Sequence, residues 1–250
     1  ELDEVPRDAP VVFSAHGVPK SVPAEAQARN MIWLDATCPL VSKVHRQAER
    51  QVKDGRHIIF IGHRGHPEVI GTLGQVPPGM MTLVETEADV AALTLPQEQP
   101  LSFLTQTTLS VDDTARVVEA LKAKYPAIKG PRAEDICYAT SNRQASVKEI
   151  APACDLVLVI GAPNSSNSVR LVEVSERCGT PARLIQRAHE IDPEWLHGIG
   201  TIGVTAGASA PELLVREVVD QLAQWRQVSE RQVTTAEETL IFKLPRQLTA

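Results

Sequence analysis

The sequence predicts an α/β protein whose sheets are mainly parallel. Strand-like apolar runs alternate with helical patterns along its 250 residues, and such alternation is typical of βαβ units. Five of the apolar runs pass directly into a loop of small polar residues or histidines and then into a helix. The chain also contains a repeat. Two stretches that begin at Asp35 and Asp135, roughly 100 residues apart, each run from a cysteine through a helix into a strand that ends in glycine.

The expected strands and helices follow in chain order. We expect the five strands at residues 11–14, 57–61, 101–104, 156–160 and 201–204. We expect helices at residues 40–53, 111–125, 141–149, 169–177 and 211–227. The apolar stretch at 240–245 could add an edge strand, which Pro245 would end.

The repeat predicts the domain organisation. We expect a second domain at 38–136 and a third at 137–225, with 226–250 as a C-terminal tail. Residues 1–37 would then be the remnant of a first domain. The chain starts at Glu1, shortly before a strand of buried type, and we therefore expect that N-terminal sequence is missing.

The composition excludes several classes of partner. A hydrophobic content of 43% with 22% charged residues is typical of a folded globular chain. The net charge of −6 and the lack of a basic tract argue against binding to nucleic acid or to an anionic membrane. No apolar run approaches the roughly 20 residues that a membrane span needs, and the first residues do not resemble a signal peptide. We expect a cytoplasmic protein.

The five loops at the ends of the strands predict a site for an anion. In open parallel sheets, ligands bind beyond the carboxyl ends of the strands, where helix N-termini present free N–H groups. The loops contain hydroxyl, amide and imidazole groups but no lysine, and Arg64 is their one arginine. Such donors hold a diphosphate by geometry rather than by bulk charge. Ser, Thr and Asn in these loops could be plain helix caps, but a cap needs only one such residue.

The four cysteines fit neither a zinc ribbon nor a disulfide scaffold, because none forms a CxxC pair. Cys38 and Cys137 each stand at the start of an expected helix, where the helix dipole and free N–H groups stabilise a thiolate. Either cysteine alone could be a small buried apolar residue, but their matching positions favour a nucleophile or a metal ligand. Cys154 and Cys178 have no such placement.

Imidazole and carboxylate groups are expected to share one site. His16 and His66 lie in strand-to-helix loops beside glycines, and Glu68 follows His66 by two positions. A carboxyl that carries a proton would therefore face the same opening as an imidazole. The alternative is a carboxylate in the first turn of a helix, stabilised by the helix dipole, and for Glu68 taken alone this alternative is the better one.

Motifs along nearly the whole chain resemble those of the LytB family, the 4-hydroxy-3-methylbut-2-enyl diphosphate reductases. They occur in one order and include both cysteines that open helices. The motifs are FSAHGV at 13–18, DATCPLV at 35–41, GHRGHPEV at 62–69, TQTTLSVDDT at 105–114, DICYAT at 135–140, NSSNS at 164–168 and VTAGASAP at 204–211.

The resemblance implies a trefoil of three α/β domains around a central iron–sulfur cluster, with the first domain incomplete in this chain. It implies the last step of non-mevalonate isoprenoid synthesis, in which an allylic diphosphate undergoes two-electron reductive dehydration to isopentenyl and dimethylallyl diphosphates. An external protein would donate the electrons. The roles that the resemblance implies are [4Fe–4S] ligands for Cys38 and Cys137, diphosphate contacts for His16, His66, Ser165, Ser166, Asn167 and Ser209, contact with the allylic alcohol and proton relay for Thr107, and proton donation for Glu68.

The chain departs from the family pattern at its start. The glycine-rich loop with the first cluster cysteine and a further histidine is not found, so we expect an impaired cluster, and neither Cys154 nor Cys178 lies in a motif that would replace the ligand. Two other functions stay open. One is a zinc-dependent hydrolase of diphosphate esters that uses His16, His66, Glu68 and a cysteine. The other is an inert module or fragment that binds diphosphate.

Overall fold

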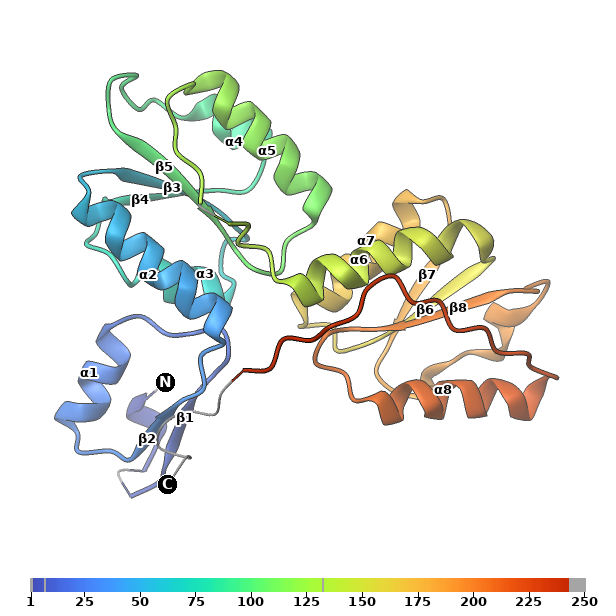
Figure 1. The fold of residues 1–250 in the computed structure, drawn as a ribbon. Coiled ribbons are helices and arrows are strands. Elements are labelled where there is room, and N and C mark those ends of the chain that lie inside the picture. The colour runs from blue at the N-terminus through green and yellow to red at the C-terminus, as the bar shows by residue number, and fades with distance from the viewer. Residues whose placement is uncertain (1, 7, 132, 243–250) are drawn as a thin grey trace. The chain divides into compact units, whose positions relative to one another are not determined.

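The computed structural model describes residues 2–6, 8–131 and 133–242, and these form three parallel sheets (Figure 1). The chain divides into two compact units. Unit 1 contains the described residues of 1–107, 112–136 and 240–250, and unit 2 contains Thr108–Val111 and Cys137–Thr239. Each strand pairing among the described residues is parallel. The predicted fold class is confirmed.

Unit 1 contains two of the sheets. In the smaller sheet, β1 (Val11–Phe13) pairs with β2 (Trp33–Asp35), and α1 (Ser21–Ala28) connects them. The larger sheet has the order β4-β3-β5. Its elements are β3 (His57–Ile61), β4 (Met81–Val84), β5 (Leu101–Thr105), α2 (Pro39–Lys53), α3 (Pro67–Leu73), α4 (Glu87–Ala92) and α5 (Val111–Lys124).

The central strand of this sheet is covered on both faces. All five residues of β3 are buried, and its alternate residues Ile58 and Phe60 pack against Val44 and Ala48 of α2. Helices α2 and α3 lie on one face of the sheet, while α4 and α5 lie on the other (Figure 1). A strand buried on both faces is a continuous apolar run, which explains why its bounds could be predicted to the residue.

Unit 2 repeats this layering around a sheet of order β7-β6-β8. Val157 and Val159 of the central strand pack with Leu171 and Val174, whereas Leu158 and Ile160 face a second cluster. The elements are α6 (Tyr138–Ile150), β6 (Leu156–Ile160), α7 (Ser166–Arg177), β7 (Ala182–Ile185), β8 (Ile202–Ala206) and α8 (Glu212–Trp225). Four short 3-10 helices complete the described structure: η1 (Leu2–Glu4), η2 (Ala151–Ala153), η3 (Ala188–Glu190) and η4 (Pro193–Leu196).

The structure differs from the sequence prediction at the edges of the sheets. Strands β2, β4 and β7 were not predicted, because each is only three or four residues long and at least two of its residues are not buried. Residues 240–242 are not in a strand, so the predicted edge strand is wrong there, and 243–245 lie outside the described residues. The predicted division into 1–37, 38–136, 137–225 and 226–250 stays a prediction.

No helix in the described ranges combines the length and the apolar character needed to cross a membrane.

Candidate functional site

Both predicted helix-opening cysteines are helix N-caps. Cys38 precedes α2 with φ −54° and ψ 134°, and Cys137 precedes α6 with φ −61° and ψ 134°. Neither side chain forms a capping hydrogen bond, and both thiols are free and only partly buried. Pro39 occupies the first turn of α2, where a backbone N–H has no intrahelical partner to lose. Each thiol is therefore available at the positive end of a helix.

The thiols fit an iron–sulfur cluster as two ligands of a larger set. Thiolate is the ligand that iron–sulfur clusters use, and among the described residues neither thiol forms a disulfide or a capping hydrogen bond. Cys38 belongs to unit 1 and Cys137 to unit 2. Within the described part of the chain, no three His, Cys, Asp or Glu side chains form a group that could hold a metal ion.

Glu68 and Thr107 form a buried pair in unit 1. Glu68 lies in the first turn of α3, after β3, and Thr107 follows β5, the neighbour of β3 in the sheet. The backbone N–H of Thr107 donates to Oε1 of Glu68 at 2.6 Å, and its hydroxyl donates to Oε2 at 2.8 Å. Glu68 is 1% exposed. Parallel pairing of the two strands brings these residues together.

Burial raises the pKa of Glu68 to about 7, because the charged form loses its hydration. The two hydrogen bonds from Thr107 favour the carboxylate and partly oppose this shift, while the negative charge of Asp135 adds to it. Glu68 therefore holds a proton near neutral pH and can release it, which is what a general acid needs.

A Thr107→Val variant tests this electrostatic balance. Loss of the hydroxyl removes one of the hydrogen bonds that favour the Glu68 carboxylate, so we expect the pKa of Glu68 to rise. The carboxyl band in infrared difference spectra would titrate with a midpoint at higher pH. Thr107→Ser retains a hydroxyl and should leave the midpoint near that of the parent. An unchanged midpoint in the valine variant would contradict the assigned hydrogen bond.

The His66 imidazole is neutral at physiological pH. Burial, followed by the nearby charges of His16 and His63, lowers the pKa of His66 to about 4. Its Nδ1 accepts the backbone N–H of Glu68 at 3.2 Å, which leaves Nε2 to carry the proton. The rings of His16 and His66 meet edge to face with centroids 5.4 Å apart. Unit 1 therefore places two imidazoles, one of them with an Nε2–H donor, at the start of the helix that carries Glu68.

Two glycines allow this approach. A Cβ at Gly71 of α3 would lie 2.8 Å from the carbonyl oxygen of Gly17, and one at Gly74 would lie 2.4 Å from Cβ of Pro19. Gly17 has a φ of +75°, a backbone conformation that residues with a Cβ rarely adopt. The loop that carries His16 thus rests directly on the backbone of α3. The backbone N–H of Cys38 also donates to the carbonyl of Ala15 at 3.0 Å, which places Cys38 next to the same loop.

The candidate diphosphate contacts of unit 2 lie after the carboxyl ends of β6 and β8. Because these strands are neighbours, the loops after them meet, and the N–H of Gly207 donates to the carbonyl of Ile160 at 2.8 Å. Ser165 caps α7 by accepting the N–H of Ser168 at 3.3 Å. A Cβ at Gly161 or Gly207 would meet Oγ of Ser168, at 2.1 and 2.2 Å. Glycine is therefore required at both 161 and 207, which pack against Ser168.

Asn167 carries unpaired polar atoms in a buried position. It is 6% exposed, and neither Nδ2 nor Oδ1 has a hydrogen-bond partner among the described residues. An unpaired buried amide is costly unless a ligand completes it. Ser166 donates to the carbonyl of Thr108 at 3.2 Å, and Ser209 is exposed in the loop after β8. The unmet amide of Asn167 indicates a polar ligand in this part of unit 2.

The predicted site residues divide between the two units. Unit 1 contains His16, His66, Glu68, Thr107 and Cys38, and unit 2 contains Ser165, Ser166, Asn167, Ser209 and Cys137.

The sequence prediction missed two supporting side chains in unit 1. Asp135 is buried, accepts the N–H of Thr105 at 3.3 Å and pairs with Lys43 at 3.2 Å. Gln106 is fully buried, and its Oε1 accepts the N–H of His63 at 2.9 Å. Both residues lie within motifs noted above, but the sequence carries no signal for these contacts.

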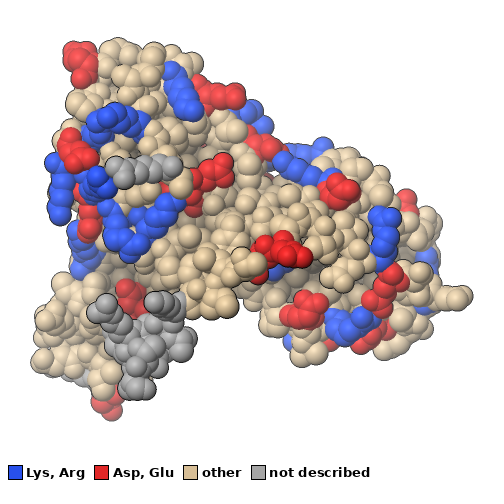
Figure 2. Space-filling model, in the orientation of Figure 1, with Lys and Arg blue, Asp and Glu red and all other residues tan. Residues whose placement is uncertain are grey.

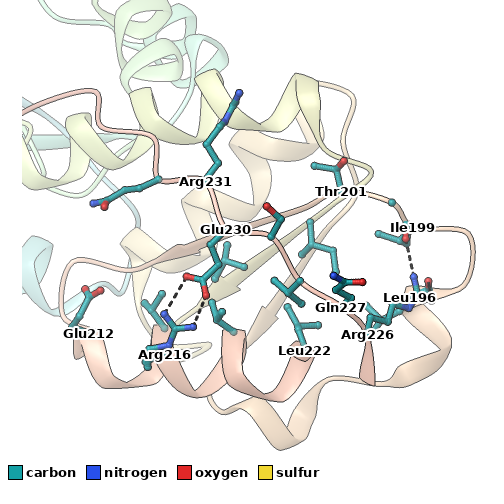
Figure 3. Close-up of a pocket in the computed structure, with 18 residues that line it drawn as sticks. Leu196, Ile199, Thr201, Glu212, Arg216, Leu222, Arg226, Gln227, Glu230 and Arg231 are labelled. Carbon is teal, nitrogen blue, oxygen red and sulfur yellow. Dashed lines mark hydrogen bonds and ion pairs between the residues drawn. The ribbon is translucent and has the colours of Figure 1, made fainter. Parts of the chain in front are cut away.

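A large cavity elsewhere in unit 2 is not the predicted site. It has a volume of about 800 Å³ and lies between α8, β8 and the segment from Arg226 to Gln232 (Figure 3). A pair of hydrogen bonds joins Arg216 to Glu230 along its wall, at 3.1 and 2.7 Å. None of the predicted site residues lines this cavity.

The fold and these side chains define a class: a parallel α/β protein with cysteines that open helices and with donor-rich loops at the ends of its strands. The chain belongs to the LytB family. The family model described as LytB protein matches residues 1–223.

The chain is similar to curated reductases and to solved structures. It is 58% identical over 248 residues to a 4-hydroxy-3-methylbut-2-enyl diphosphate reductase from Phenylobacterium zucineum, covering 99% of this chain and 79% of the relative. It is 60% identical over 249 residues to the enzyme of that name from Ruegeria pomeroyi, with the same coverage. The E-1-hydroxy-2-methyl-but-2-enyl-4-diphosphate reductase from Plasmodium falciparum has a similar structure, with a TM-score of 0.95, 36% identity, and coverage of 100% of this chain and 79% of that one.

A second solved structure is similar over a smaller part of the chain. It is described as (E)-4-hydroxy-3-methyl-but-2-enyl diphosphate reductase, the terminal enzyme of the non-mevalonate pathway. The TM-score is 0.59 with 31% identity, covering 88% of this chain and 78% of that one.

Proposed function

We propose that this protein is a 4-hydroxy-3-methylbut-2-enyl diphosphate reductase that acts in the cytoplasm. It would reduce the allylic alcohol diphosphate with two electrons, release water and yield isopentenyl and dimethylallyl diphosphates. The relatives' names support this activity over the diphosphate-ester hydrolase and the inert binding module considered above. The buried Glu68–Thr107 pair is the single structural observation that supports it most, because the leaving hydroxyl must receive a proton.

The side chains divide the work between binding and proton transfer. His16, the Nε2–H of His66 and the loop residues of unit 2 would bind the diphosphate, with Ser165, Ser166, Asn167 and Ser209 as the unit 2 donors. These contacts bind the diphosphate, a group remote from the reacting carbon, and thereby fix the orientation of the substrate. Glu68 would supply the proton for the departing hydroxyl, with the Thr107 hydroxyl as relay.

Cys38 and Cys137 would hold an iron–sulfur cluster as two of its thiolate ligands. When bound, a [4Fe–4S] cluster supplies electrons and an open iron that acts as a Lewis acid toward oxygen. An external electron donor is required, because every turnover consumes two electrons that must be resupplied.

Anaerobic turnover tests the function directly. The protein, loaded with iron and sulfide, is incubated with the allylic alcohol diphosphate and reduced methyl viologen, and the products are identified by NMR. We expect isopentenyl and dimethylallyl diphosphates. Release of inorganic phosphate or diphosphate without reduction would favour the hydrolase instead. The absence of any product from protein whose iron and sulfide content corresponds to a full cluster would contradict both enzymes.

An Asn167→Leu variant tests the diphosphate contact. Because the amide is buried and unpaired without ligand, leucine of similar size should leave the free protein as stable or more stable. The KM for the substrate should rise by roughly tenfold or more, because a hydrogen bond to a charged group is lost. Steady-state kinetics and thermal melts with added inorganic diphosphate measure the two effects. Gln224→Leu, on the exposed side of α8, is the control. A lower melting temperature with unchanged KM would contradict the assignment.

A further inference from the structure

Basic residues line one side of α2. Lys43, Arg46, Arg50 and Lys53 are spaced by three, four and three positions, so they lie along one face of the helix. The buried residues Val41, Val44 and Ala48 occupy the opposite face. Figure 2 shows Lys and Arg side chains gathered over this part of unit 1. We call the four residues the α2 basic stripe.

Most of the stripe lacks charge partners. Arg46, Arg50 and Lys53 are exposed, and no described carboxylate lies within ion-pair distance of them. The one acidic residue of α2, Glu49, pairs instead with Lys20. A chain with a net charge of −6 thus presents a local cationic surface on which three of the four basic side chains have no ion pair with a described carboxylate.

The stripe runs along the helix that Cys38 opens. Lys43 anchors its first part by donating to the carbonyl of Glu134 at 2.6 Å and pairing with Asp135 at 3.2 Å. Arg46 is eight residues from Cys38, which corresponds to about 12 Å along a helix axis. A partner bound to the stripe would lie near one of the proposed cluster ligands, and electron transfer is fastest over short distances.

We propose that the α2 basic stripe is the docking surface for an acidic one-electron carrier protein. This inference rests on the proposed function. Each turnover would consume two reduced carriers, each oxidised by one electron. The carbon–oxygen bond of the allylic alcohol breaks, the hydroxyl leaves as water with one proton, and a second proton forms the new carbon–hydrogen bond. Two electrons and two protons therefore balance the loss of water and the reduction of the carbon.

The charge distribution favours this partner over others. An acidic carrier is repelled by most of an acidic protein and attracted by the stripe, so that electrostatic steering orients the encounter. A nucleic acid would need a larger basic surface, because its affinity comes from many phosphate contacts. A membrane surface is disfavoured for the same reason.

Charge reversal with two electron sources tests the docking surface. Turnover is measured with an acidic [2Fe–2S] ferredoxin kept reduced by its reductase, and separately with reduced methyl viologen. For Arg50→Glu we expect kcat/KM for the ferredoxin to fall by on the order of tenfold at low ionic strength. The rate with methyl viologen should not fall. Lys122→Glu on α5, across the sheet from α2, makes the same charge change in unit 1 and should match the parent with both donors.

The salt dependence provides a second readout. Raising the ionic strength from 0.01 to 0.15 M shortens the screening length from about 30 Å to about 8 Å, so the ferredoxin-supported rate of the parent should drop. An Arg50→Glu variant that matches Lys122→Glu with ferredoxin would overturn the docking surface. A ferredoxin-supported rate that does not change with salt would also overturn it. So would inhibition of the parent by a DNA duplex, if the Arg50→Glu variant were not inhibited. Failure of a parent protein with a full complement of iron and sulfide to turn over with methyl viologen would instead contradict the proposed function.

Discussion

Replacement of Cys38 or Cys137 by serine is expected to lower reductase turnover to below about a thousandth of the parent value, because loss of a thiolate ligand removes the group that supplies electrons. Iron content per chain and the visible absorption of the cluster should fall in parallel. Anaerobic iron and sulfide analysis together with the turnover assay measure these effects.

Serine should preserve the fold at these positions. Both cysteines are N-caps without a capping hydrogen bond, and serine is among the best N-cap residues. The melting temperature of the apo protein should therefore stay the same or rise. Cys178→Ser, at the C-terminal end of α7, is the matched control and should retain iron and activity. If the serine variants retain full iron and turnover, neither cysteine is a ligand.

Glu68→Gln should lower kcat by roughly 10²- to 10⁴-fold, the range typical for loss of a general acid. The amide cannot donate a carboxyl proton, although its oxygen can still accept the N–H of Thr107. In the parent, activity should decline as the pH rises through about 7, because Glu68 then loses its proton. Steady-state rates across pH measure both effects. Glu98→Gln, an exposed position in unit 1, is the control and should behave as the parent.

The same substitution should change the pH dependence of stability. The pKa of Glu68 is raised from 4.5 to about 7 in the folded protein, so the unfolded chain ionises first as the pH rises. Below about pH 4.5 this residue has no effect, and between 4.5 and 7 the parent should lose stability. The accumulated loss above pH 7 is on the order of 3 kcal/mol. Denaturant unfolding of parent and Glu68→Gln across this range isolates the contribution as a difference. A parallel pH dependence in the two proteins would show that Glu68 is not a neutral acid in the fold.

The sequence was sufficient for elements whose pattern is local. Strands β3 and β6 are buried on both faces, so their apolar runs marked their bounds. The N-caps of α2 and α6 were predictable because a cysteine, followed in one case by proline, precedes each helical pattern. Helix α7 begins at Ser166, three residues earlier than predicted, because its first turn consists of polar residues without helical periodicity.

Contacts between distant segments could not be predicted in this way. Glu68 and Thr107 meet because β3 lies between β4 and β5 in the sheet and pairs with both. The order of strands in a sheet cannot be read from the residues of any one segment. The pairing of Lys43 with Asp135 joins residues on different elements for the same reason. The resemblance to a family suggested which residues share a site, whereas the raised pKa of Glu68 and the unpaired amide of Asn167 required coordinates.

The contact of Gly71 and Gly74 with the loop at Gly17 and Pro19 has a consequence for how this chain can vary. Helix α3 contacts the loop after β1 there, through the backbone of Gly17 and the ring of Pro19, so a Cβ at either glycine of α3 would force a shift between the segments that carry His16 and His66. The spacing of the His16 and His66 imidazoles therefore depends on the lack of side chains at Gly71 and Gly74. Substitutions in α3 and in the first loop must therefore be compatible with each other, even though neither glycine takes part in chemistry.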